Sequence, residues 1–389
     1  MSGLEGFEGF EGFEGFEGFE GFEGFEGFEG FGRSARSAAG ALIGHRDGIV
    51  GPWNAPTSWF APTPLPMEDF TQLSRWDPSV RAKIFDFELL SNLHFASDLG
   101  TAPGLQATLW HFEKTVLGDG GKQPVGTLTA LVEIKRPSNA VLLKQLDYVI
   151  GWSDLRSDRA REIVSQMTYQ FPFWGSIVPL RSGRSSFTLE LMRVALRLAS
   201  FAAQRFKHAL CVRRPHEYSP QVQPMIQTPG HGSFPSGHST QAFAVARLLI
   251  GLLPRPIVPA APNQLVQQLM AQAARIAINR TVAGVHFPID SLVGQVLGLA
   301  TAEYLIARCK PEVDPTPSLS APPALSSVDA WSFNGDDNTI GDFSGGEFYD
   351  VTTASDVAGQ TFATKTAGAV KVNGSNLLNW LWRNAALEW

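Results

Sequence analysis

Three short segments in the second half of the chain combine cationic side chains, histidines and a small-residue turn. Their residues, in chain order, are Lys207, Arg214, Ser236, Gly237, His238, Arg280, His286 and Asp290. Guanidinium groups offer forked donors to oxyanion oxygens, and an ammonium group offers a compact positive charge. With two histidines beside them, these cations could hold a tetrahedral oxyanion and carry out nucleophilic and acid–base chemistry on it.

Ser236 and Gly237 stand where a helix over 237–253 is expected to begin, with Ser236 as its N-cap. Free backbone N–H groups and the helix dipole favour an anion at such an end, and a glycine lets the backbone approach closely. We therefore expect an oxyanion cage, a name used below for five residues. They are Lys207, Arg214, Ser236, Gly237 and Arg280.

His286 is followed four residues later by Asp290. If a helix begins near Pro288, the carboxylate can reach back to one ring nitrogen, which fixes the tautomer and raises the basicity of the other nitrogen. His238, one residue past the glycine, could contact the opposite side of the anion. A nucleophile on one side and an acid on the other is the arrangement that in-line phosphoryl transfer requires.

Each piece alone has an ordinary structural explanation, but the joint pattern in this order is specific. It resembles the signature of the superfamily of type 2 phosphatidic acid phosphatases, bacterial class A acid phosphatases and vanadium-dependent haloperoxidases. That signature is Lys-x6-Arg-Pro, then Pro-Ser-Gly-His, then Ser-Arg-x5-His-x3-Asp. The gaps of 19 residues between Pro215 and Pro235 and of 40 between His238 and Asn279 fit it, and the resemblance covers 187–307. Asn279 departs from the pattern, which has Ser there.

The resemblance implies that the cage binds the oxyanion and that His286 attacks it to form a phosphohistidine. His238 would protonate the leaving alkoxide and then activate water, while Asp290 orients His286. In a haloperoxidase, His286 would instead be the axial ligand of vanadate. The fold that the resemblance implies is all-α, a helical bundle with the site in its core.

We favour a phosphatase acting on a phosphate monoester, without metal or cofactor, because 285–290 resembles the phosphatase form of the third motif. The alternative is a vanadium-dependent haloperoxidase that oxidises halide with hydrogen peroxide and carries vanadate. Phe234 could then line a halide site and His231 could tune it. A third hypothesis is a non-catalytic oxyanion-binding scaffold, although buried unpaired cations are costly to keep.

Apolar periodicity predicts helices that would position these residues. They cover 79–92, 138–151, 157–167, 187–210, 237–253, 264–282 and 290–307. Residues 107–117 and 126–134 could be short strands or parts of an irregular N-terminal strap that begins at Pro52. The expected fold is therefore all-α, with this strap and a loose C-terminal tail.

Three regions are expected: a disordered repeat and linker over 1–51, the helical domain over 52–310, and a linker and appendage over 311–389. Residues Glu5–Phe31 are nine Glu-Gly-Phe triplets, whose period of three fits neither helix nor strand. Phe spaced regularly among Gly is typical of tracts that self-associate. The tail ends in the Trp-rich segment 377–389, which looks like an amphipathic docking segment.

Charge and hydropathy limit the partners. Nine of the 37 acidic residues lie in the repeat, so without it the net charge of −6 becomes +3. A body so close to neutral lacks the basic excess that nucleic-acid binding requires. The apolar stretches 242–253 and 289–307 are short or interrupted by polar residues, so we expect core helices, no transmembrane span and a cytoplasmic protein whose substrate is a small, soluble phosphate ester.

Overall fold

A computed structural model of the chain describes residues 44–46, 48–55, 64–65, 69–97, 105–118, 123–168, 170–253, 264–310, 325–350, 355–356 and 360–389. The Glu-Gly-Phe repeat and the expected linker over 311–323 lie outside these residues. Self-association through the repeat therefore stays a prediction.

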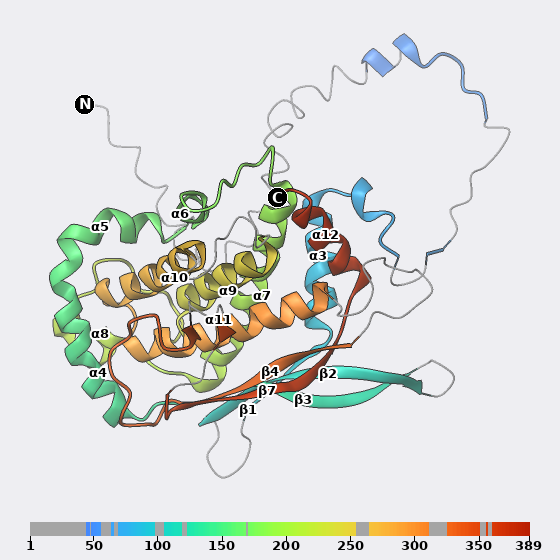
Figure 1. Cartoon of the computed structure of the whole chain (residues 1–389). Coiled ribbons are helices and arrows are strands. Elements are labelled where there is room, and N and C mark those ends of the chain that lie inside the picture. Colours follow the sequence, from blue (N-terminus) through green and yellow to red (C-terminus); the bar gives the residue numbers. More distant parts are fainter. Residues whose placement is uncertain are drawn as a thin grey trace, which may run out of the picture.

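The seven helices expected from apolar periodicity are all present, and their ends differ from the expected ends by no more than two residues. They are α3 (Pro78–Leu90), α4 (Asn139–Trp152), α5 (Arg156–Ser165), α7 (Ser186–Leu210), α9 (Gly237–Leu252), α10 (Gln264–Val282) and α11 (Pro288–Cys309). Shorter helices are α6 (Phe171–Gly175), α8 (Pro215–Tyr218) and α12 (Asn376–Ala386), and 3₁₀ turns cover Leu73–Arg75, Ser153–Leu155 and Pro220–Val222. Figure 1 shows the helices gathered over one face of a sheet.

The all-α class was wrong, because five strands form one mixed sheet in the order β1-β2-β3-β4-β7. The strands are β1 (Leu93–Ser97), β2 (Gln106–Gly118), β3 (Gln123–Lys135), β4 (Leu325–Asn334) and β7 (Ala363–Asn373). Neighbouring strands pair antiparallel except β3 and β4, which are parallel. Two short strands, β5 (Tyr349–Asp350) and β6 (Ser355–Asp356), form a separate pair. The strap is therefore largely a hairpin and an edge strand.

The C-terminal tail is not loose, because parts of its strands bury alternate residues. Trp331 and Phe333 of β4 are buried, and so are Val370 and Val372 of β7, which gives the two-residue period of a sheet packed on one face. The tail is rich in Gly, Asp, Asn, Ser and Thr, which are typical of loops, so this period is not evident from its sequence. Pairing with β3 places the tail beside a strand far away in the sequence.

Helix α12 packs along α7, and the residues that follow α12 cap the first turn of α7. The Glu388 carboxylate accepts hydrogen bonds from the backbone N–H groups of Phe187 and Thr188 at 2.8 Å each, so it satisfies donors at the first turn of α7. A negative charge at this end is also favoured by the helix dipole. The expected amphipathic docking segment therefore exists, and it docks on the helix that carries Lys207.

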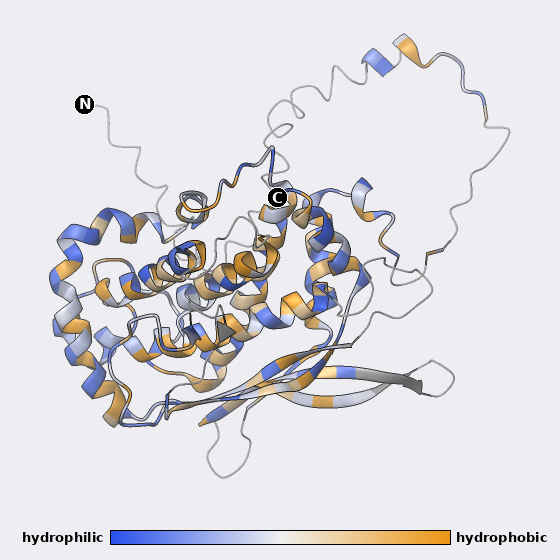
Figure 2. Cartoon of the chain, in the orientation of Figure 1, coloured by the Kyte–Doolittle hydropathy of each residue, from blue (hydrophilic) through white to orange (hydrophobic). Residues whose placement is uncertain are grey.

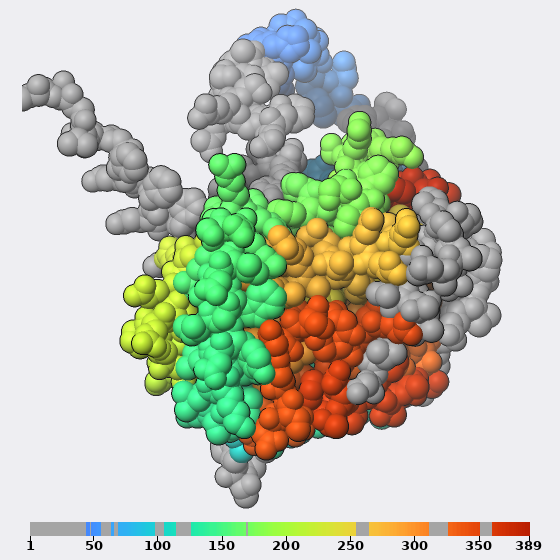
Figure 3. Space-filling view, turned by 60° about the vertical axis from the view of Figure 1, so that its left-hand side comes forward, coloured from blue at the N-terminus to red at the C-terminus, as the bar shows by residue number. Residues whose placement is uncertain are grey.

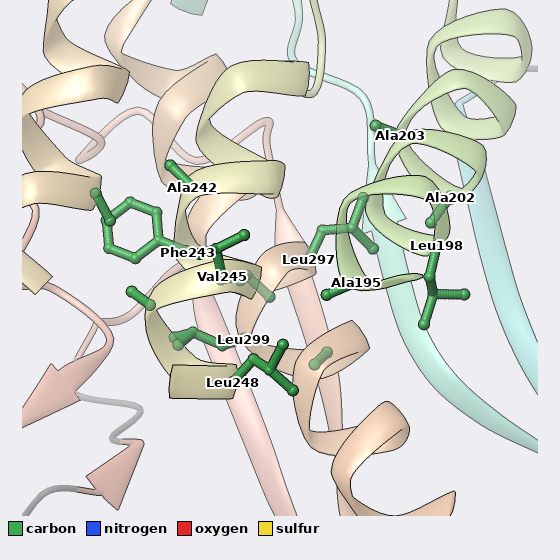
Figure 4. Packing of buried hydrophobic residues seen from close by; sticks show 14 of the residues in the cluster. Ala195, Leu198, Ala202, Ala203, Ala242, Phe243, Val245, Leu248, Leu297 and Leu299 are labelled. Carbon is green, nitrogen blue, oxygen red and sulfur yellow. The ribbon is translucent and has the colours of Figure 1, made fainter. Parts of the chain in front are cut away.

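The core lies where α7, α9 and α11 pack together. Figure 4 shows Ala195 and Leu198 of α7 and Val245 and Leu248 of α9 near Leu297 of α11. Figure 2 shows that apolar residues mark much of these helices, while the outer helices carry more hydrophilic ones. The site therefore sits on helices that the core holds in place.

Helix α11 is buried over almost its whole length. Among the described residues it is the one helix that is long and apolar enough to cross a membrane, and 89% of its apolar window is buried inside the protein. Burial of this kind is what we expected for 289–307, and it is a property of core helices.

Candidate active site

The third motif places His286 just before α11 and Asp290 in its first turn. The two side chains meet, with His286 Nδ1 2.9 Å from Asp290 Oδ2. The same carboxylate oxygen accepts a hydrogen bond of 2.9 Å from the backbone N–H of Phe287. Because a carboxylate accepts, Nδ1 of His286 carries the proton and Nε2 keeps its lone pair. This is the tautomer that a nucleophilic histidine needs.

Lys207 lies in the last turn of α7 and is buried, with 2% of its surface exposed. Its ammonium group donates to the backbone oxygens of Gly232 at 3.0 Å and Ser233 at 3.3 Å. A Cβ added to Gly237 would lie 3.9 Å from Cε of Lys207. The end of α7 therefore lies directly beside the beginning of α9.

Arg214 follows the end of α7 and is also buried. Its guanidinium group donates to the backbone oxygens of His231 and Val285, both at 3.0 Å. Its Nη2 atom is 3.2 Å from Nδ1 of His231. Carbonyl oxygens hold this side chain in place without cancelling its charge. The contact with Val285 places it one residue from His286.

The second motif begins α9 as expected. The Ser236 hydroxyl accepts a hydrogen bond of 3.4 Å from the backbone N–H of Ser239, so it is the N-cap. The backbone N–H of Ser236 donates to the carbonyl oxygen of Asp290 at 2.9 Å. This bond joins the N-cap of α9 to the first turn of α11. The helix start that carries Gly237 therefore lies beside the helix start that His286 precedes.

The electrostatics of the two central groups follow from their burial among cations. Burial lowers the pKa of His286 well below its ordinary value, and the positive charges of Arg214 and Lys207 add to this effect. Charges on His238 and His231 act in the same direction. The site therefore favours the uncharged form of the ring.

Burial raises the pKa of Asp290 to about 7. The hydrogen bond from the Phe287 N–H and the charges of Lys207 and Arg214 act in the opposite direction. Below neutral pH the carboxyl thus takes up a proton more readily than an exposed aspartate would.

Arg280 and His238 meet at a residue that the motifs do not contain. Nη2 of Arg280 donates to Oε1 of Gln166 at 3.3 Å, and Nε2 of His238 is 3.2 Å from the Gln166 carbonyl oxygen. Gln166 is fully buried at the C-cap of α5. Its contacts leave no signal in the sequence, because an isolated glutamine after a polar helix belongs to no motif.

The eight expected site residues thus come from the ends of four elements, α7, α9, α10 and α11, and from the connections between them. His231, considered only as a halide-tuning residue, contacts Arg214. Phe234 is fully buried and its ring lies 6.4 Å from that of Phe333 in β4, so it packs on the sheet. Within the described part of the chain, no group of three or more His, Cys, Asp or Glu side chains could hold a metal ion.

Known proteins are similar to this chain in the region that contains the three motifs. Residues 191–312 match the PAP2 superfamily. Over 90 residues the chain is 37% identical to the decaprenylphosphoryl-5-phosphoribose phosphatase of Mycobacterium tuberculosis, in strains CDC 1551 / Oshkosh and ATCC 25618 / H37Rv. The matched stretch is 22% of this chain and 43% of each relative, so the chain matches less than half the length of these curated relatives.

A solved structure is also similar, the crystal structure of the first transmembrane PAP2 type phosphatidylglycerolphosphate phosphatase from Bacillus subtilis. The identity is 21%, the TM-score is 0.33, and the match covers 43% of this chain and 85% of that one. A TM-score of this size does not establish a shared fold. The segments from Lys207 to Asp290 all lie within the region that matches the PAP2 superfamily, so this region of the chain is similar to that superfamily.

Proposed function

We propose that this chain is a phosphatase that hydrolyses a phosphate monoester through a phosphohistidine on His286. The observation that carries the proposal is the buried His286–Asp290 pair, in which Nδ1 is held by a carboxylate and the pKa of His286 is lowered by burial and by Arg214 and Lys207. A ring kept neutral beside cations is a nucleophile placed where a phosphate dianion would bind.

In the first step, Nε2 of His286 attacks phosphorus and forms a P–N bond while the P–O bond to the leaving group breaks. His238 gives its proton to the leaving alkoxide. In the second step, His238 takes a proton from water, the hydroxide attacks phosphorus, and the P–N bond breaks to release inorganic phosphate and His286. The oxyanion cage stabilises the negative charge throughout.

The substrate class is a phosphate ester, which is also the class named for the Mycobacterium tuberculosis relatives. The cage contacts the phosphate and not the rest of the molecule, so it supports the class without selecting the alcohol. The partly exposed members of the site are Gly237 and His238, together with His231 and Gly232. We therefore expect the ester to enter from this side, with its leaving group next to His238.

A titration with orthovanadate tests the proposal. The purified chain is assayed with p-nitrophenyl phosphate, and His286→Ala is compared with His208→Ala, which changes an exposed histidine one residue after Lys207. We expect hydrolysis by the wild type and by His208→Ala, competitive inhibition by vanadate, and no hydrolysis by His286→Ala. Vanadate-dependent bromination with peroxide, without phosphate release, would replace the phosphatase by a haloperoxidase. If the chain showed neither activity, the oxyanion-binding scaffold would be the remaining hypothesis.

A further inference from the structure

The C-terminal turn of α5, residues 163–166, lies against two site residues at once. Arg280 donates through Nη2 to the Ile163 carbonyl oxygen at 3.0 Å and to Oε1 of Gln166 at 3.3 Å. The carbonyl oxygen of Gln166 lies 3.2 Å from Nε2 of His238. Figure 3 shows the arm formed by α4 and α5 along this face of the molecule, beside α10. One short turn therefore contacts both a cage cation and the acid–base histidine.

A polar network fixes this turn to α10. Asn279, the residue before Arg280, donates through Nδ2 to Oε1 of Glu162 and to Oε1 of Gln166, each at 2.9 Å. Arg275, one turn earlier on α10, donates to Glu162 at 2.8 Å. Nε2 of Gln166 donates to Oε1 of Glu162 at 3.0 Å. The Gln166 amide thus donates to Glu162 and accepts from Asn279 and Arg280. These bonds set which end of the amide is the oxygen.

This network explains why Asn279 departs from the superfamily pattern. Its Nδ2 donates to two acceptors on α5, and its Oδ1 accepts a hydrogen bond of 3.2 Å from Arg159. A serine has a shorter side chain and a single hydroxyl proton, so it cannot make these three bonds. Asn279, the one residue that departs from the motif, therefore connects the site to α5.

We propose that Gln166 is a positioning residue of the site, held by Asn279, which orients Arg280 through its side chain and His238 through its carbonyl oxygen. The inference rests on the proposed phosphatase. An amide oxygen orients a guanidinium group without cancelling its charge, which a carboxylate would do. A carbonyl oxygen only accepts, so it places a proton on Nε2 of His238 and leaves Nδ1 to exchange the proton of the reaction.

Three variants separate this role from simple packing. Gln166→Glu keeps the shape of the side chain and places a carboxylate beside Arg280. Gln166→Met keeps much of the volume and removes both the acceptor and the donor. Asn279→Ser restores the residue of the superfamily pattern and removes the connection. Gln268→Ser, which changes an exposed amide on α10, is the control. The affinity for orthovanadate is measured by calorimetry, and kcat and KM with p-nitrophenyl phosphate.

We expect Gln166→Glu to weaken vanadate binding by about tenfold or more, because the new carboxylate would pair with Arg280 and repel the anion. Gln166→Met should weaken it less, so the order of affinity is Gln, then Met, then Glu. Asn279→Ser should lower kcat/KM by about two- to tenfold, the loss expected for the one hydrogen bond that joins Asn279 to Gln166. Gln268→Ser should match the wild type.

Packing alone predicts a different result: Gln166→Glu, the variant closest in shape, would bind vanadate as well as the wild type, and a lower melting temperature would be the main effect. That result, or full activity in Asn279→Ser, overturns the inference and leaves the phosphatase proposal intact. A wild-type chain that neither binds vanadate nor hydrolyses the ester overturns both.

Discussion

The ring Nδ1 of His286 lies 2.9 Å from Oδ2 of Asp290, and both side chains are buried. The carboxylate also accepts from the Phe287 N–H, so its orientation is fixed by the first turn of α11. The geometry of this pair therefore comes from the local sequence, because His286 and Asp290 lie four residues apart on either side of the start of α11. What the rest of the fold supplies is the burial and the cations.

Asp290→Asn should lower kcat by up to about 10⁴-fold, the loss found when the aspartate that orients a catalytic histidine is replaced by asparagine. An asparagine offers an N–H₂ group as well as an oxygen, so it no longer selects the tautomer in which Nε2 attacks. KM should change little because the cations remain. The measurement is steady-state kinetics with p-nitrophenyl phosphate, and a variant with wild-type kcat would remove Asp290 from the mechanism.

The pH profile follows from the raised pKa of Asp290. Burial raises it to about 7, and the carboxyl must be ionised to accept the Nδ1 proton. Because a raised pKa means that an acid gains its proton at a higher pH, kcat/KM should fall as the pH drops below about 7. An aspartate with an ordinary pKa would keep its charge down to about pH 4. A profile that stays flat from pH 7 to pH 5 would contradict this assignment.

Lys207→Met should weaken vanadate inhibition by about tenfold or more, because a buried charge near the anion is lost. The Lys207 charge also lowers the pKa values of Asp290 and His286. Its removal should therefore raise both and shift the acid limb of kcat/KM, which Asp290 sets, to higher pH. Arg193→Met, on the same helix and partly exposed, is the control. Unchanged inhibition in Lys207→Met would exclude this lysine from the cage.

Gly294→Ala should disturb the contact between α11 and α9. A Cβ at 294 would lie 2.6 Å from Cβ of Ser239 and 2.9 Å from the carbonyl oxygen of Ser236, which is too close for a real side chain. We expect a loss of about 1–3 kcal/mol in the free energy of unfolding and a lower kcat, since the N-terminus of α9 must shift. Gly151→Ala on α4, where a Cβ meets nothing within 4 Å, should cause neither effect in thermal unfolding or in the assay.

Much of the site could be predicted because its geometry is local. The N-cap at Ser236 and the spacing of His286 and Asp290 depend on helix starts, and a helix start has a sequence signal. The expectation that Lys207 and Gly237 come together rested on the joint pattern of the three segments and on the resemblance, because no local signal fixes their distance. Packing of α7, α9 and α11 in one core brings them together in the structure.

Gln166 could not be predicted in this way. Its contacts with Arg280 and His238 depend on where the end of α5 lies against α10, which is decided by side-chain packing and by Glu162. The departure at Asn279 is visible in the sequence, but the position flanks Arg280 and does not contact the anion directly, so its connection to α5 was not foreseen. A buried amide is informative only once its hydrogen-bond partners are seen.

The sheet was missed for a related reason. β2 and β3 were considered as short strands, but β4 and β7 lie in a tail with the composition of loops. Buried residues alternate along β4 and at the end of β7, and β4 pairs with β3, which lies far away in the sequence. Parallel pairing of distant segments leaves no local signal, so the expected all-α class rested on the helices and on the resemblance.

The most direct test is to trap the covalent intermediate. The purified full-length chain is mixed with a radiolabelled phosphate monoester and quenched in alkali, which preserves phosphohistidine, and the labelled peptide is sequenced. We predict label on His286, label retained in His208→Ala, and none in His286→Ala. Turnover without a covalent label, or label on a residue other than His286, would contradict the account.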